Sequence, residues 1–150
     1  MPIAAGEFEA FFAEAEPRLR RALVAACGVD GRDAVAEALT WAWEHWDRVQ
    51  QLSNPVAYLY RVGRSRVRRR RQRLLFPAPA MHTPWVEPAL VPALVALSEQ
   101  QRVVVVLVHG YGWSQREVAE LLEIAPSTVQ THLERALARL RSALEVSADA

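Results

Sequence analysis

Arginine is concentrated in one short stretch of the chain. Residues 61–73, RVGRSRVRRRRQR, hold eight arginines in thirteen positions, although the whole chain has a net charge of only +1. The other ten arginines stand against all seventeen acidic residues, so the remainder carries a charge of −7. Guanidinium groups bind phosphate through paired hydrogen bonds. A basic segment in an acidic body therefore indicates that the chain binds a polyanion.

Part of this basic segment forms a regular pattern. Four arginines recur at three- and four-residue spacing, which places them in one stripe if the segment is helical: Arg61, Arg64, Arg68 and Arg71. Each phosphate that such a stripe neutralises steepens the salt dependence of binding by about 0.9 in log–log slope. A solvated basic face and a non-specific RNA-binding segment are the alternative interpretations.

A second group of polar residues lies near the C-terminus, in WSQREVAELLEIAPSTVQTHLERALARLRSAL. Ser114 and Glu117 have the spacing of a capping box, and Pro126 suits the first position of a second helix. Ala119 and Val129, ten residues apart, are a small and a β-branched residue, as a helix-turn-helix needs where its helices cross. Six polar residues then point outward and can reach base edges in a major groove: Ser127, Thr128, Gln130, Thr131, Glu134 and Arg135. A helical hairpin with a solvated outer face is the alternative.

Three helices are predicted to position the basic segment. The first covers residues 5–27, and Pro17 is expected to kink or split it. The second covers about 32–48, with Trp43 and Trp46 facing inward and Trp41 off that stripe. The third begins after Asn54 and Pro55, a good N-cap and first-turn pair, and runs into the arginines with Leu59, Tyr60, Gly63 and Val67 facing inward.

Proline-rich sequence separates these helices from the C-terminal ones. Five prolines lie between residues 76 and 92, which predicts a stiff, extended linker. RVVVVLVHG has the propensity of a buried strand, but no second strand is in sight, so a buried helix is expected. The sequence therefore predicts an all-α protein with two small helical domains, 1–75 and 93–150, joined by the linker 76–92.

Several classes of protein are disfavoured. One cysteine, Cys27, is too few for a disulfide framework and fits the cytoplasm. The N-terminus is not a signal peptide, and no apolar run is long enough for a membrane helix. The four histidines have no metal-ligand spacing, and neither a phosphate-binding glycine loop nor a nucleophile elbow is present. We expect a cytoplasmic protein that is not an enzyme and needs no metal or cofactor.

The segment ALSEQQRVVVVLVHGYGWSQREVAELLEIAPSTVQTHLERALARLRSAL resembles region 4 of the bacterial sigma-70 family. GRDAVAEALTWAWEHWDRV and NPVAYLYRVGRSRVRRRRQR resemble region 2. Their order, the linker and the short length are similar to the extracytoplasmic-function (ECF) group, which retains only regions 2 and 4. Basic residues that are all arginine suit an actinobacterial member.

This resemblance implies partners and roles for named residues. Region 2 would bind core RNA polymerase and open the minus-10 promoter element, region 4 would read the minus-35 element, and an anti-sigma factor would hold the free protein. Four residues of the second helix would contact the polymerase clamp: Asp33, Glu37, Trp41 and Glu44. The loop before the third helix would capture an unstacked base through Gln50, Gln51, Asn54 and Tyr58. Phosphate contacts would come from the arginine stripe and from Arg116 and Arg139.

The chain also departs from the family pattern. In this group the second helix usually has a Gln-Glu pair before an aromatic residue; here Ala36 stands in place of the Gln and Leu39 in place of the aromatic residue. In the third helix, Ser65 and Arg69 stand where an Asn and an Asp are usual. The turn glycine of region 4 is Glu123, and its serine cap is Ala125. Two further hypotheses therefore stay open: a stand-alone regulator with a LuxR-like helix-turn-helix, and a sigma-like decoy that binds polymerase without opening promoters.

Overall fold

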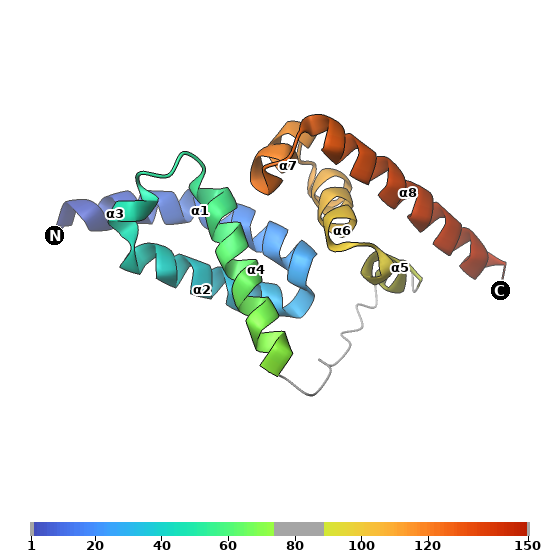
Figure 1. Cartoon of the computed structure of the whole chain (residues 1–150), viewed down its shortest axis with the longest axis horizontal. Coiled ribbons are helices and arrows are strands. Elements are labelled where there is room, and N and C mark those ends of the chain that lie inside the picture. The colour runs from blue at the N-terminus through green and yellow to red at the C-terminus, as the bar shows by residue number, and fades with distance from the viewer. Residues whose placement is uncertain (1, 74–88, 150) are drawn as a thin grey trace. The chain divides into compact units, whose positions relative to one another are not determined.

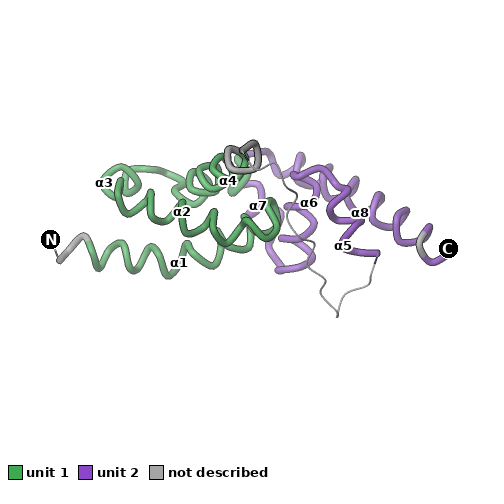
Figure 2. The backbone as a smooth tube through the Cα atoms, turned by 90° about the horizontal axis from the view of Figure 1, so that it is seen from below, with its two compact units in different colours: residues 1–73, 120–123 green, residues 74–119, 124–150 purple. Residues whose placement is uncertain are grey.

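A computed structural model describes residues 2–73 and 89–149, excluding the side chains of residues 2–4, 69–73 and 147. Within these ranges every regular element is helical (Figure 1). The chain divides into two compact units, Met1–Arg73 with Glu120–Glu123, and Leu74–Ala119 with Ile124–Ala150 (Figure 2). No helix of the described ranges combines the length and apolar character needed to span a membrane.

The first unit is built on three mutually packed helices, α1 (Pro2–Cys27), α2 (Gly31–Glu44) and α4 (Pro55–Arg73). A single 3-10 turn, Gly28–Asp30, joins α1 to α2. Their apolar faces meet in a core that includes Leu19, Leu23, Ala38, Leu59 and Tyr60, each almost fully buried. Glycine at position 31 permits a close approach of α2 to α1, because a Cβ on Gly31 would lie 2.6 Å from the Val24 backbone.

Pro17 does not split the first helix into two, which was one of the two outcomes expected from the sequence. Helix α1 continues through it for 26 residues. Proline removes one backbone hydrogen bond and costs about 3 kcal/mol in a helix interior. Burial of Leu19, Ala22 and Leu23 immediately after it offsets this cost, because these side chains pack only if the helix continues.

The predicted helix 32–48 is interrupted at His45, so the expectation of one helix was wrong. Helix α2 ends at Glu44, and the short α3 (Trp46–Val49) follows. The His45 imidazole Nδ1 lies 2.9 Å from the carbonyl oxygen of Trp41, to which the His45 backbone N–H also donates. The side chain thus takes part in ending α2.

Trp43 does not face the core as expected. Its side chain is 51% exposed, because its position on α2 lies at the edge of the α1 interface, where its ring meets Phe8 edge-on at 4.9 Å. Trp41 and Trp46 are both half-buried. Expectations for α4 are confirmed: Asn54 Oδ1 accepts from the Ala57 backbone N–H at 3.2 Å, and Leu59, Tyr60, Gly63 and Val67 are buried.

The second unit contains α5 (Leu90–Ala96), α6 (Glu99–Val105), a π-helical turn (Val106–Gly110), most of α7 (Gln115–Leu122) and α8 (Pro126–Ala148). The end of α7, from Glu120 on, belongs to the first unit. The valine run is helical, as expected, and α8 packs on α6 and α5. The core includes Val103, Val104, Leu107, Val129 and Ala136. Residues 90–92 of the predicted extended linker belong to α5, and residues 76–88 of that linker lie outside the described part of the chain.

Candidate nucleic-acid interface

Local hydrogen bonds set the start of α7. The Ser114 backbone N–H donates to Glu117 Oε2 at 2.8 Å, and the Glu117 N–H donates to Ser114 Oγ at 3.1 Å. This reciprocal pair is the predicted capping box, and it satisfies two backbone donors that a helix start leaves free. The expected α7 is therefore confirmed, with Ala119 buried on its inner side.

The turn after α7 contains a strained residue. Glu123 has φ = 54°, a left-handed conformation that costs a non-glycine residue about 1–2 kcal/mol. Ala125 has the extended backbone of an N-cap but makes no side-chain cap bond, and Pro126 opens α8. Both departures noted in the sequence therefore have structural counterparts: a strained turn and an uncapped α8 that nevertheless forms.

The outer face of α8 carries the predicted polar group. All six predicted residues are exposed: Ser127, Thr128, Gln130, Thr131, Glu134 and Arg135. Gln130 Nε2 donates to Glu134 Oε1 at 2.8 Å, and Thr131 Oγ1 donates to the Ser127 carbonyl oxygen at 3.1 Å. These bonds orient an amide and a hydroxyl along one helix face. The arrangement offers donors and acceptors of the kind that read base edges.

The two arginines predicted to contact phosphate in this unit differ in their surroundings. Arg116 is exposed on α7. Arg139 is also exposed, but its Nη1 donates to Gln101 Oε1 at 3.0 Å and its Nη2 to the Ala96 carbonyl oxygen at 3.2 Å. The Arg139 guanidinium thus ties α8 to α5 and α6, a structural role that residue spacing alone did not reveal.

The arginine stripe of α4 is less uniform than its spacing suggested. Arg61 and Arg68 are exposed, whereas Arg64 is half-buried with its guanidinium carbon 5.5 Å from the centre of the Tyr60 ring. Arg66, outside the predicted stripe, lies 3.9 Å from a carboxylate oxygen of Glu37 on α2. The side chain of Arg71 lies outside the described part of the structure.

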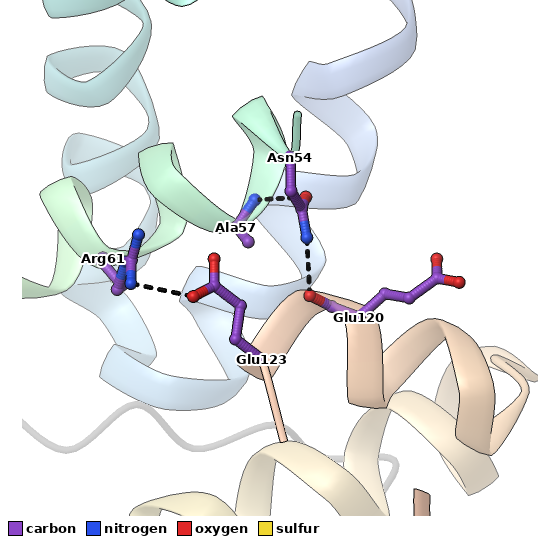
Figure 3. A network of polar contacts seen from close by, with 5 residues as sticks. All are labelled: Asn54, Ala57, Arg61, Glu120 and Glu123. Atoms are coloured by element: carbon purple, nitrogen blue, oxygen red, sulfur yellow. Dashed lines mark hydrogen bonds and ion pairs between the residues drawn. The ribbon is translucent and has the colours of Figure 1, made fainter. Parts of the chain in front are cut away.

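Polar residues at the start of α4 are engaged within the first unit (Figure 3). Asn54 Nδ2 donates to the Glu120 carbonyl oxygen at 2.8 Å, while its Oδ1 caps α4. Arg61 Nη1 lies 3.0 Å from Glu123 Oε2. Both side chains of this ion pair are largely exposed, at 56% and 43%, so it contributes little to stability.

The predicted loop residues are only partly brought together. Gln50 Nε2 donates to Glu7 Oε2 of α1 at 2.8 Å, and Gln51 is exposed. Tyr58 is half-buried, 5.4 Å from the Trp41 ring. The loop amides of Gln50 and Asn54 therefore have separate partners, and Tyr58 groups with an aromatic of α2.

Arg48 is a candidate that sequence inspection missed. Its guanidinium carbon lies 5.9 Å from the ring centres of both Trp41 and Tyr58. His45 stacks on Trp41 at 4.4 Å with an interplanar angle of 15°. The resulting cluster combines stacking surfaces with a positive charge, which are the components of a site for an unstacked base. The sequence signal that could have indicated this cluster is the separation of seven residues between Trp41 and Arg48.

Three of the four predicted polymerase-contact residues line one groove. Glu37, Trp41 and Glu44 bound a groove of about 250 Å³ together with Ala36, Thr40 and Arg66. Asp33 is exposed on α2 but does not line it. The groove carries two carboxylates and the Arg66 guanidinium beside an indole ring, so one negative charge remains and the surface suits a basic partner. The described residues include no cluster of three or more metal-ligating side chains.

Comparison with known proteins identifies related chains. Residues 89–140 match the family model described as sigma-70, region 4. The RNA polymerase sigma-E factor of Streptomyces avermitilis is 34% identical over 129 residues, covering 78% of this chain and 72% of the relative. The sigma-E factor of Streptomyces antibioticus is 35% identical over the same length and coverage.

Solved structures share the fold. The sigma factor RpoE from Bartonella quintana, crystallised with the anti-sigma factor NepR, matches with a TM-score of 0.66 at 24% identity, covering 93% of this chain and 98% of that one. CnrH, in complex with the cytosolic domain of CnrY, matches with a TM-score of 0.60 at 24% identity, covering 93% and 88%. The identity and coverage of the Streptomyces relatives, together with the region 4 match, show that the chain belongs to the sigma-70 family of RNA polymerase sigma factors and acts in transcription initiation.

Proposed function

We propose that the two units of this sigma factor divide the work of promoter recognition. The first unit binds core RNA polymerase and the minus-10 element, and α8 of the second unit reads the minus-35 element. The exposed polar face of α8, after a capped α7 and a left-handed turn, carries this proposal. In this assignment Gln130 and Thr131 face base edges, while Arg116 binds phosphate.

Contacts with core polymerase are assigned to α2. The carboxylates of Glu37 and Glu44 flank Trp41 in one groove, and Asp33 lies on the same helix. Carboxylates at such a surface increase the association rate and the specificity for a basic partner, while the indole provides the apolar contact. Core polymerase is the catalyst in this scheme, so the chain itself is not an enzyme.

Contacts with the minus-10 element are assigned to α4 and the residues before it. Arg61, Arg64, Arg68 and Arg71 would bind phosphates, and Gln50, Gln51, Asn54 and Tyr58 would hold the unstacked base. The exposure of Arg61, Arg68 and Gln51 supports this assignment. Asn54 and Gln50 would exchange their internal hydrogen bonds for bonds to DNA.

The proposed setting is the cytoplasm, with an anti-sigma factor as a further partner. A solved structure with the same fold supports this partner, because the sigma factor RpoE of Bartonella quintana was crystallised with an anti-sigma factor. Such a factor would have to cover surfaces that polymerase needs, and the groove on α2 is one of them.

Run-off transcription tests the proposal. Purified core polymerase is supplied with fragmented genomic DNA, with and without the chain, and with the Gln130→Ala variant. Gln100→Ala, at an exposed glutamine of α6, is the matched control. We expect discrete transcripts with the chain and with the control, and weaker ones with Gln130→Ala.

Two outcomes would contradict the proposal. Co-elution with core polymerase without any transcript would indicate a decoy that binds polymerase but opens no promoter. Absence of both co-elution and transcripts would indicate a DNA-binding regulator that acts without polymerase.

A further inference from the structure

One carboxylate lies on the face of α8 that we assign to DNA. Among the six exposed polar residues of that face, Glu134 is the single acid. The phosphates of a duplex repel a carboxylate, so Glu134 weakens DNA binding unless another group gains from its presence. The proposed function assigns Gln130 and Thr131 to base edges and leaves Glu134 without a role.

Ion pairing along α8 does not account for this carboxylate. On a helix, a side chain meets the residues three and four positions away. None of these four neighbours of Glu134 is basic: Gln130, Thr131, Leu137 and Ala138. Arg135 follows directly in the sequence and therefore points to a different side of the helix.

The Glu134 carboxylate instead holds the amide of Gln130. Gln130 Nε2 donates to Glu134 Oε1 at 2.8 Å. A hydrogen bond to an ionised acceptor is stronger than one between neutral groups. The bond fixes the orientation of the amide, because a turned amide would place its oxygen against the carboxylate. Both side chains are exposed, so the bond adds little to the stability of the helix.

A fixed amide presents one donor and one acceptor in a set order. Nε2 of Gln130 carries two hydrogens, and the one not given to Glu134 can donate to a base, while Oε1 can accept. Of the four bases, only adenine offers an acceptor, N7, beside a donor, N6, in the major groove. Guanine offers two acceptors, N7 and O6, and would place O6 against the amide oxygen. The fixed amide therefore matches adenine and opposes guanine.

The two residues lie at different depths along α8. In a helix-turn-helix, the N-terminal residues of the second helix reach the base edges. Gln130 lies near the start of α8, which begins at Pro126, and Glu134 lies about 6 Å further along the axis. Entry into a groove lowers the local dielectric and strengthens the bond between them. Glu134 is therefore placed to hold the amide, and Gln130 to meet the base.

We propose that Glu134 is a positioning residue that makes α8 selective for adenine at the base contacted by Gln130. The inference rests on the proposed function, because it requires α8 in the major groove. It adds the identity of one base of the recognised element and the residue that sets it. Without Glu134 the amide is free to turn its nitrogen toward the guanine acceptors, so the two purines are distinguished less well.

Selection from a random DNA pool tests the inference. The probe is a duplex with about ten consecutive randomised base pairs, one helical turn. The full chain selects duplexes with core polymerase present, and polymerase alone gives the background. Gln130→Ala identifies the position that Gln130 reads, as the one where the preference disappears. We expect the wild-type chain to favour adenine over guanine there by about tenfold or more.

Variants at position 134 separate positioning from a merely structural role, which would weaken all sequences equally. Glu134→Ala should lower the adenine preference at the Gln130 position about threefold or more and leave the other positions unchanged. Glu134→Gln should restore it, because its amide oxygen accepts the same bond. Glu145→Ala, the same change at an exposed glutamate later in α8, is the control and should alter no preference. Circular dichroism verifies that each variant folds.

Several results would overturn the inference. These are a base other than adenine at the Gln130 position, an unchanged preference in Glu134→Ala, or an equal change in Glu145→Ala. A preference lost at a different position in Glu134→Ala would mean that Glu134 contacts a base directly. Enrichment of no sequence would remove α8 as a reader of bases, and the inference with it. Run-off transcription separates these failures from failure of the proposed function in polymerase, because transcripts from the wild-type chain leave only the role of Glu134 refuted.

Discussion

Replacing Gly31 by alanine tests how closely α1 and α2 approach. An alanine Cβ at this position would lie 2.6 Å from both Val24 Cα and Val24 N, and 2.7 Å from the Leu23 carbonyl carbon. All three are backbone atoms, so no change of side-chain rotamer relieves the clash. Since carbon atoms pack favourably at about 3.5 Å, the two helices would have to separate locally by about 1 Å.

The expected cost follows from this displacement. Overpacking of a close-packed interior costs about 1–3 kcal/mol, and a clash with backbone belongs at the upper end. The higher helix propensity of alanine relative to glycine offsets about 1 kcal/mol of this destabilisation. We therefore expect Gly31→Ala to lower the free energy of unfolding of the first unit by about 2 kcal/mol, which corresponds to a fall in Tm of about 8–16 °C.

Gly6→Ala is the matched control, because a Cβ at Gly6 in α1 meets no atom within 4 Å. It should raise the free energy of unfolding by about 0.5–1 kcal/mol. Thermal unfolding of the full chain, followed by far-ultraviolet circular dichroism, compares both variants with the wild type. If Gly31→Ala unfolded at the temperature of Gly6→Ala, the close packing of α1 on α2 would be refuted.

Three further predictions concern α8, α4 and α2. Ala125→Ser should stabilise the second unit by about 1 kcal/mol, because the N-cap of α8 has no side-chain bond; Ser98→Ala, which removes the capping box of α6, should cost about the same. Equal thermal stability of both variants would contradict this. Arg68→Gln should lower the log–log salt slope of promoter binding by about 0.9 if Arg68 binds a phosphate of duplex DNA, measured by anisotropy between 50 and 200 mM salt; an unchanged slope would place Arg68 outside the interface. Trp41→Ala should weaken binding to core polymerase about tenfold or more without loss of helicity, whereas Val146→Ala, at an exposed apolar residue of α8, should not; equal binding by wild type and Trp41→Ala in a co-elution titration would argue against the assigned contact.

Local sequence signals predicted much of the fold because the groups that interact are close in the chain. Asn54 caps α4 through an amide three residues away, and Ser114 and Glu117 close a reciprocal pair at the same spacing. Helical periodicity likewise identified the buried face of α4 and the six exposed residues of α8. Such features need only the geometry of a single helix.

Other features depend on residues far apart in sequence. Trp43 is exposed because its place relative to α1 is decided by helix packing, and Arg139 bonds to Gln101 and the Ala96 carbonyl, about forty residues away. A groove between α1 and α2 likewise forms only once the two helices pack together.

The sequence by itself therefore determined that α4, α7 and α8 form and which face of α8 is polar, because these properties repeat with the period of one helix. The family resemblance followed from the residues of its motifs. Tertiary structure alone decided the continuity of α1 through Pro17, the exposure of Trp43 and the partners of Gln50, Arg66 and Arg139. The physical reason is that packing between helices outweighs local propensity, and it brings together side chains whose separation along the chain carries no signal.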